Sequence, residues 1–225
     1  MRMLGRTAAV LGLACLAQAP SLSAQSIIGF DAFKWYIGAQ AGFTVFETPA
    51  QTRGGIFTAG GHMLVTARRT GLLLEVQEGI KTNQVTSFAD ATAPGGTRQV
   101  TFNDLRRYSA TILAFPFKTV AQPYLGIGFG LMQTVKEYPA GTFANAAAKD
   151  AAAATAHRLG SYSFANFTLG VQIRVSEFAV FGQGQITTSP TGRLLTGPTF
   201  GLTTGLRISL GNAREGTGKD AGSGD

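Results

Sequence analysis

Apolar and polar side chains alternate along the last regular segment of the chain, Thr199 to Leu210. One set of alternate positions is mostly apolar: Phe200, Leu202, Thr204, Leu206, Ile208 and Leu210. The other set is small or polar: Thr199, Gly201, Thr203, Gly205, Arg207 and Ser209. Side chains of a strand point to opposite faces in turn, so this segment predicts a strand with one apolar face. At ~3.3 Å per residue it extends over roughly 40 Å, enough for a tilted crossing of a bilayer core.

Seven earlier segments repeat the alternation. They cover residues 34–45, 56–66, 72–77, 106–115, 121–132, 162–174 and 178–188. The connections are longer after the first, third, fifth and seventh predicted strands and short after the others. A membrane barrel entered from the periplasm has short turns on that side and long loops outside. The sequence therefore predicts an all-β fold, an eight-stranded antiparallel up-and-down transmembrane β-barrel over residues 34–211.

A secreted soluble barrel of the lipocalin type is the main alternative. Its outer face would carry Gly, Thr and Gln with few charges, which is unusual for a soluble surface. Charged residues make up 14% of the chain, and 30 of its 225 residues are Gly. Ordinary soluble domains have ~25% charged residues and ~7% Gly. The composition favours the membrane barrel.

The two ends of the chain differ from the predicted barrel. Residues 1–24 have a basic start, a short apolar core and small residues before a cleavage point, which is typical of a secretory signal peptide. Cys15, the only cysteine, lies in this segment, so the mature chain would have no thiol chemistry. Residues 25–33 would form a lead-in. Residues 212–225 are Gly-rich and charged, and we expect a disordered periplasmic tail.

The longest predicted loop runs from Lys136 to Gly160. Within it, nine of the seventeen residues from Phe143 to Leu159 are Ala, the best helix former. Thr142 could cap the start of a helix and Gly160 its end. We expect a short Ala-rich helix in this third outer loop, with a disordered loop as the alternative.

Aromatic residues gather near the ends of the predicted strands, which resembles the two interfacial girdles of membrane barrels. They are Trp35, Phe115, Phe117 and Phe178 on the turn side, and Phe46, Phe57, Tyr108, Tyr162 and Phe200 on the loop side.

On these patterns the chain resembles the small outer-membrane barrels of the OmpA, OmpX and OmpW type. The resemblance is carried by Pro123-Tyr124-Leu125-Gly126-Ile127-Gly128-Phe129-Gly130 and by Gly205-Leu206-Arg207-Ile208-Ser209-Leu210. The second run looks like the last-strand signal read by the barrel-assembly machinery, although fifteen residues follow Leu210. The tail is too short for the peptidoglycan-binding domain of OmpA-type proteins. The resemblance implies an outer-membrane location, with membrane lipid and the assembly machinery as partners.

The inward faces of the predicted strands carry the candidate functional residues, a lumen charge network of Glu75, Lys34, Arg107, Arg174 and Arg207. Six glutamines share these faces: Gln40, Gln77, Gln122, Gln172, Gln183 and Gln185. Buried charges need partners, so we expect Glu75 to pair with one or more of the arginines. Eight strands leave an interior just wide enough for side chains, which predicts a plugged polar core, with a narrow gated pore as the alternative.

Histidine offers little catalytic chemistry. His62 falls on an inward face, where it could be a general base or simply part of a hydrogen-bond network. His157 lies in the Ala-rich loop, where we expect it to be solvated. Two distant histidines without cysteine make a poor metal site, so no metal, cofactor or catalytic residue is predicted.

Three functions remain open from the sequence. The first is a structural or surface-interaction barrel whose outer loops, residues 81–99 and 136–160, meet an external partner of unknown identity. The second is a small pore or transporter for ions or hydrophobic compounds, which the OmpW resemblance allows. A lipid-A-modifying enzyme is the third. Basic residues are scattered rather than clustered, so no nucleic-acid partner is expected.

Overall fold

The computed structural model describes residues 33–80, 83–117 and 119–213. They form the strands β1 (Phe33–Thr48), β2 (Gln51–Ala67), β3 (Thr70–Ile80), β4 (Gln84–Ala89), β5 (Thr97–Ala114), β6 (Ala121–Pro139), β7 (Ser161–Val175), β8 (Phe178–Thr187) and β9 (Thr196–Ala213). One α-helix, α1 (Ala146–Gly160), and a short 3-10 turn, Pro94–Gly96, complete the order. Among the described residues, no helix is long and apolar enough to cross a membrane.

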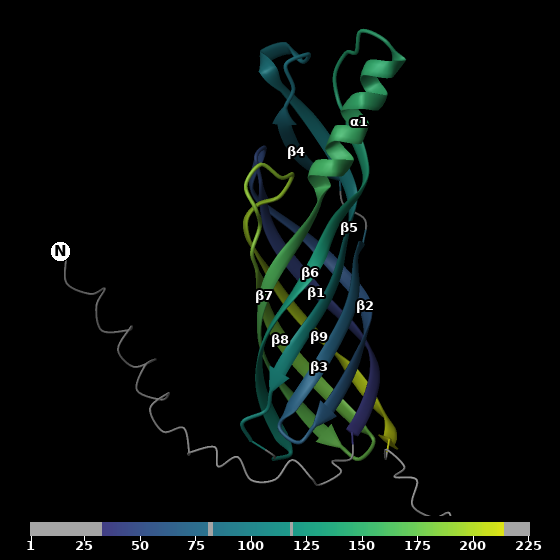
Figure 1. The fold of residues 1–225 in the computed structure, drawn as a ribbon, viewed down its shortest axis with the longest axis vertical. Helices are drawn as coiled ribbons and strands as arrows, with labels where there is room; N and C mark the ends of the chain where they lie inside the picture. The colour runs from purple at the N-terminus through teal and green to yellow at the C-terminus, as the bar shows by residue number, and fades with distance from the viewer. Residues whose placement is uncertain (1–32, 81–82, 118, 214–225) are drawn as a thin grey trace, which may run out of the picture. The chain divides into compact units, whose positions relative to one another are not determined.

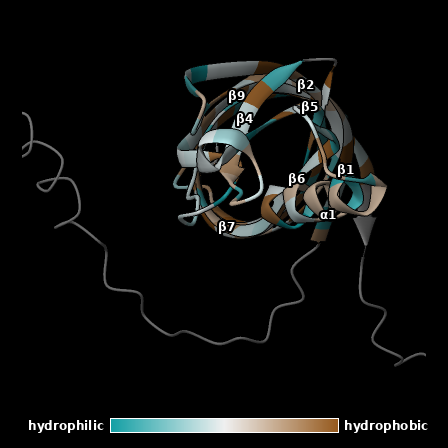
Figure 2. Ribbon diagram, turned by 90° about the horizontal axis from the view of Figure 1, so that it is seen from above, coloured by the Kyte–Doolittle hydropathy of each residue, from teal (hydrophilic) through white to brown (hydrophobic). Residues whose placement is uncertain are grey.

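Eight of the strands close into an antiparallel barrel (Figure 1). Consecutive barrel strands pair with one another, and β9 pairs with β1 to close the ring. β3 pairs directly with β5, so β4 lies outside the ring. Seen from above, the strands form a ring (Figure 2). The predicted eight-stranded barrel is confirmed.

The register fixes the tilt of the strands. Starting at Trp35 of β1, one can step from each residue to its partner on the next strand until the row has gone once around the barrel. The row reaches β1 again at Val45, ten residues further along the strand. A shear of ten in eight strands corresponds to a tilt of about 40°. At ~3.3 Å per residue, the 18 residues of β5 then rise about 45 Å along the barrel axis, well beyond a ~30 Å hydrocarbon core.

The outer face of the barrel is apolar and the inner face is mixed. Leu206 is 56% exposed and Ile127 is 67% exposed, whereas Arg207, next to Leu206, is fully buried. Large apolar side chains are exposed on all eight barrel strands. This is the lipid-facing arrangement that the alternation predicted, since only a hydrocarbon solvent accommodates such a belt.

Side chains fill the lumen in layers. Near the turn end, buried Tyr36, Leu64, Leu73, Leu113, Phe115 and Tyr124 form a lower apolar layer. Near the loop end, an upper apolar layer consists of Phe46, Ile56, Phe102, Leu105, Met132, Tyr162, Phe164 and Leu195. Polar residues lie between them: along β1, the order is Tyr36, Gln40, Thr44 and Phe46. Phe46, Phe115 and Tyr162 thus fill the interior, and their assignment to interfacial girdles was wrong.

A headpiece stands beyond the barrel at the loop end (Figure 1). It consists of β4, the upper parts of β5 and β6, and α1, and it has its own core of Phe88, Val100, Ala152, Ala156 and Leu194, with Phe143 and Leu159 against it. Two boundaries predicted from the sequence were therefore wrong. Much of the expected loop at residues 81–99 is a hairpin of β4 and β5, so the fourth barrel strand begins at Thr97 rather than Arg106. β6 likewise continues to Pro139, past the predicted loop start at Lys136.

The expected Ala-rich helix is present, but its cap differs from the prediction. The side chain of Asn145, not Thr142, accepts the first hydrogen bond, from Ala148 N at 2.8 Å. Gly160 is the last helical residue and has no positive φ. Glycine is required there for space, because a Cβ would lie 1.9 Å from Thr134 Oγ1.

Three predictions about the chain ends lie outside the described residues. They are the signal peptide at residues 1–24, nearly all of the lead-in at 25–33, and most of the tail at 212–225.

Candidate functional site

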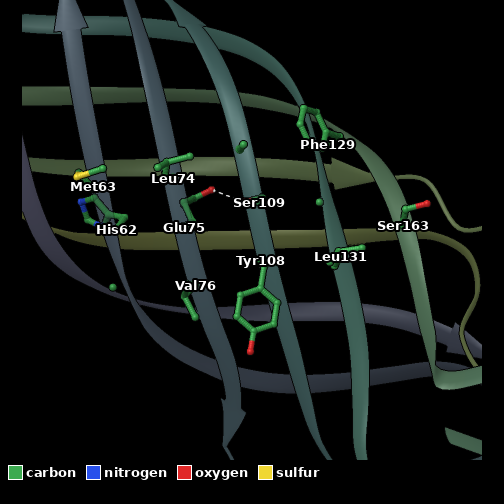
Figure 3. A pocket seen from close by; sticks show the side chains of 13 residues that line it. His62, Met63, Leu74, Glu75, Val76, Tyr108, Ser109, Phe129, Leu131 and Ser163 are labelled. Atoms are coloured by element: carbon green, nitrogen blue, oxygen red, sulfur yellow. Dashed lines mark hydrogen bonds between the residues drawn. The ribbon is translucent and has the colours of Figure 1, made fainter. Parts of the chain in front are cut away.

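Glu75 lies in the middle of the polar layer, on the inward face of β3, and is 2% exposed. Its carboxylate accepts hydrogen bonds from Gln183 Nε2 at 2.7 Å, Gln185 Nε2 at 2.7 Å and Ser109 Oγ at 3.2 Å. Figure 3 shows the bond to Ser109 from the neighbouring strand β5. The two glutamines come from β8, across the barrel. Within the described part of the chain, no ion pair joins Glu75 to an arginine or lysine. Neutral donors therefore hold this carboxylate.

Arg207 is the largest fully buried side chain, on the inward face of β9. Its Nη1 donates to Gln172 Oε1 at 2.7 Å and its Nε to His62 Nε2 at 3.1 Å. The guanidinium carbon lies 3.9 Å from the ring centre of Phe181, a cation–π contact. Because an arginine donates to His62 Nε2, that nitrogen carries no proton and the imidazole is neutral. His62 therefore acts as a hydrogen-bond acceptor in the lumen.

Arg107 lies higher in the lumen, on β5, and is 4% exposed. Its Nη2 donates to Gln77 Oε1 of β3 at 2.5 Å. Its guanidinium reaches across to β9, where Nη1 would be 3.4 Å from a Cβ placed on Gly201. Arg107 and Arg207 thus lie in the same compartment as Glu75, each bonded to neutral groups.

The other two predicted members of the network lie near the turn end. Arg174 is half-buried and its guanidinium stacks at 5.8 Å over the Tyr36 ring. Lys34 is half-buried near the start of β1. The buried part of the candidate site is therefore Glu75, Arg107 and Arg207, joined by glutamines rather than by direct ion pairs. Tyr124 OH extends this set, since it donates to Gln183 Oε1 at 2.9 Å.

Arg98 is a buried residue that the sequence reasoning missed. It lies on β5 in the headpiece, where Nε bonds to Asp90 Oδ2 at 2.5 Å and Nη1 donates to Ala140 O at 2.9 Å. Its guanidinium also lies 4.2 Å over the Phe143 ring. Hydrogen bonds from Thr92 and then Arg98 lower the pKa of Asp90 to about 2. Arg98 shares its face of the strand with the apolar residues Val100 and Phe102, and this spacing of two was the signal for an inward-facing side chain.

His157 and His62 are the two histidines that could take part in catalysis or metal binding. His157 lies on α1, with Nδ1 3.5 Å from a carboxylate oxygen of Glu137 and most of its side chain in solvent. No group of three or more His, Cys, Asp and Glu is placed to hold a metal ion in the described parts of the chain. His62 is bonded to Arg207, not to a hydroxyl or carboxyl group that it could activate.

Two apolar grooves lie on the outer surface of the barrel. One, of about 730 Å³, is lined by outward residues such as Met63, Leu74, Tyr108 and Leu131, several of them labelled in Figure 3. The other, of about 810 Å³, lies over β1, β2, β8 and β9 beside Gly182 and Gly184. Both belong to the lipid-facing belt.

Comparison with solved structures identifies the fold. Neisserial surface protein A (NspA) matches with a TM-score of 0.53 at 11% sequence identity, over 77% of this chain and 96% of that one. The chain has the fold of a small outer-membrane β-barrel. The N-terminal barrel domain of Pseudomonas aeruginosa OprF matches at 0.47, with 10% identity over 80% of this chain and 99% of that domain. OprG from the same organism matches at 0.39, with 13% identity and coverages of 82% and 99%. No protein-family model and no curated protein matches the sequence.

Proposed function

We propose that this outer-membrane barrel is a closed scaffold that holds a pre-ordered headpiece at the cell surface for contact with an external partner. The observation that carries this proposal is the separate core of the headpiece. Ala152 and Ala156 of helix α1 share one buried cluster with Phe88 and Val100 of the β4–β5 hairpin. A surface ordered before binding loses less conformational entropy when a partner docks.

Arg98 supports the same proposal, because it ties three parts of the headpiece together. It bonds to Asp90 at the tip of the hairpin, to the carbonyl of Ala140 after β6, and stacks on Phe143 before α1. Charge-assisted hydrogen bonds of this kind are about twice as strong as neutral ones. The long connection from β6 to β7 is therefore fixed to the hairpin.

A filled lumen favours a scaffold over a pore. Residues of both apolar layers are at most 5% exposed, and hydrogen bonds such as those from Gln183 to Glu75 and from Arg207 to Gln172 cross the polar layer between them. The partners in this proposal are outer-membrane lipid around the belt, the assembly machinery during insertion, and an unidentified molecule at the headpiece.

Two measurements test the proposal. The purified protein in planar bilayers should give no discrete openings, whereas the double variant Phe46→Ala with Phe102→Ala, which thins the upper apolar layer, should give some. Cells carrying the protein should bind matrix proteins or other cells, and the headpiece-disrupting variant Val100→Asp should reduce that binding. Stable openings of the unmodified protein, together with binding that Val100→Asp leaves unchanged, would favour the pore.

A further inference from the structure

The apolar belt ends in a row of polar side chains on three neighbouring strands, on the side of the headpiece. On β5, the outward residue that follows Tyr108 toward the headpiece is Arg106. In the register of the barrel, Arg106 lies between Glu78 of β3 and Gln133 of β6. The row one outward step below it is apolar or aromatic and consists of Val76, Tyr108 and Leu131. On these strands the lipid-facing surface therefore changes from apolar to polar within one step.

Two exposed cations lie in this sector, and each is paired with a carboxylate. Nε and Nη2 of Arg106 both bond to Oε1 of Glu78, at 2.9 Å, and Nη1 has no partner among the described residues. Nζ of Lys136 lies 3.1 Å from Oδ2 of Asp104, the next outward residue after Arg106 on β5. At ~3.3 Å per residue, Asp104 and its lysine lie about 7 Å above Arg106. The two cations are 42% and 59% exposed, so both keep N–H groups that can bind a further anion.

An apolar groove lies directly below the polar row. It is the groove of about 730 Å³ described above, and the row of Val76, Tyr108 and Leu131 lines it (Figure 3). Its volume falls within the ~300–1,000 Å³ of typical ligand sites. Ala110 lies at its centre, a small side chain between Leu74 of β3 and Phe129 of β6. The groove is therefore continuous with the charged sector at its upper end.

We infer that this sector binds one phosphorylated glycolipid of the outer leaflet. An acyl chain lies in the groove, and the phosphate accepts hydrogen bonds from Nη1 of Arg106 and Nζ of Lys136. Arginine and lysine are the side chains that bind phosphate through charge-assisted hydrogen bonds. The carboxylates of Glu78 and Asp104 accept hydrogen bonds from sugar hydroxyls. Acidic and basic groups in alternation thus match a headgroup that contains both sugar and phosphate.

The position of the site along the barrel is consistent with this occupant. The groove belongs to the lipid-facing belt, so an acyl chain reaches it from the side without crossing water. The polar row lies on the headpiece side, which is the outer leaflet in the orientation of the proposed function. The site depends on that orientation but not on an external partner of the headpiece. A negative lipid result would therefore leave the cell-binding test of the headpiece unaffected.

Lipid binding to the purified protein tests the site. The protein is refolded in detergent and titrated with bisphosphorylated lipid A, with the same lipid after removal of its phosphates, and with phosphatidylglycerol. Native mass spectrometry counts the bound molecules. One bisphosphorylated molecule should saturate the site, and the dephosphorylated form should bind about tenfold more weakly, as expected for the loss of a charged hydrogen bond. Equal affinity for phosphatidylglycerol would assign the groove to a phospholipid and overturn the inference.

Two pairs of variants separate recognition of the headgroup from recognition of the chain. Arg106→Gln should weaken binding about tenfold, whereas Arg69→Gln, in the exposed turn between β2 and β3 at the opposite end, should not. Ala110→Leu fills the groove and should also weaken binding, whereas Ala59→Leu, in the second groove, should not. Heat-modified gel mobility checks that each variant folds, and Lys136→Gln replaces Arg106→Gln if the latter does not.

Three results would each contradict the site. The first is binding that does not depend on the phosphates of the lipid. The second is an equal loss of binding in the members of either pair, because the effect would then not be local. The third is a lipid-free dimer that Ala110→Leu dissociates, since the groove would then belong to an interface with a second copy of the chain.

Discussion

Replacing Glu75 with Gln removes the only negative charge among the nine-tenths-buried side chains of the polar layer while keeping the shape of the residue. In the unmodified protein the carboxylate accepts three hydrogen bonds, from Ser109, Gln183 and Gln185. A carboxamide has one oxygen acceptor and an NH₂ group that can only donate. At least one glutamine donor would then face another donor. Arg107 and Arg207 would remain as two buried cations without a carboxylate in the layer.

The size of the effect follows from the loss of the buried charge, and the weakening of its hydrogen bonds is part of that loss. A hydrogen bond to a charged group contributes about 1.5–3 kcal/mol and a neutral one about 0.5–1.5 kcal/mol, so each of the three bonds is weakened. Removing one partner from a buried set of charges costs about 3–5 kcal/mol. For a chain of this size, 1 kcal/mol corresponds to roughly 2–4 °C in the unfolding midpoint. We therefore expect Glu75→Gln to lower the midpoint by about 6–20 °C.

Glu78→Gln is the matched control, because Glu78 lies on the same strand but faces outward. Its ion pair with Arg106, at 2.9 Å, joins side chains that are 51% and 42% exposed. Exposed pairs contribute about 0.2–1 kcal/mol, so this change should lower the midpoint by no more than about 4 °C. Heat-modified gel mobility measures both variants. Equal shifts would refute the reasoning, since the buried charge would then contribute no more than a surface one. Any ion pathway opened by Glu75→Gln should favour anions.

Three further predictions concern the headpiece. Ala156→Asp places a charge in its buried core, so proteases should cut near α1 while the barrel midpoint changes little; an unchanged cleavage pattern would contradict the separate core. The pKa of Asp90 is lowered from 3.8 to about 2, so its contribution to hairpin stability is present above about pH 4 and is lost as the pH falls through 2. Amide hydrogen exchange of Thr92, corrected for intrinsic rates, should be constant between pH 4 and 7 and faster near pH 2, and Asp90→Asn should speed it at pH 7. Gly160→Ala should displace the end of α1 and lower protease resistance, because its Cβ would lie 1.9 Å from Thr134 Oγ1. Adding Thr134→Ala should restore that resistance. If it does not, this contact is not the cause.

The faces of the barrel strands could be predicted because the bilayer and the lumen are such different surroundings. Within the membrane, each outward position meets hydrocarbon and each inward position meets packed side chains, so the alternation in sequence is strict. Leu206 and Arg207 show the contrast at adjacent residues. The eight strands could therefore be predicted from the local alternation of residues, without knowledge of which strands pair with one another.

The headpiece could not be predicted in the same way, because its outer surface faces water. At the start of β5, Arg98, Val100 and Phe102 point inward, in alternation with Thr97, Gln99 and Thr101. The period of two is present, but the outward residues are polar, so the segment resembled a loop. The helix start was misplaced because Asn145, a stronger cap than Thr142, lies inside the run that was assigned to the helix.

The hydrogen-bond partners of Glu75 depend on the register of the whole barrel. For this reason the sequence could not predict them, and for the same reason the polar layer favours one register. Gln183 and Gln185 are 108 and 110 residues away, on β8. They meet Glu75 only because eight pairings combine to a shear of ten. A slip of two residues in one pairing would keep every apolar side chain outside, so the belt alone does not exclude it. Such a slip would, however, change the height of β8 relative to β3. The carboxylate of Glu75 would then be separated from its amide donors, and the carboxylate and the amides would be buried without partners. The polar layer therefore contributes what the belt does not, a preference for one register among several with the same faces.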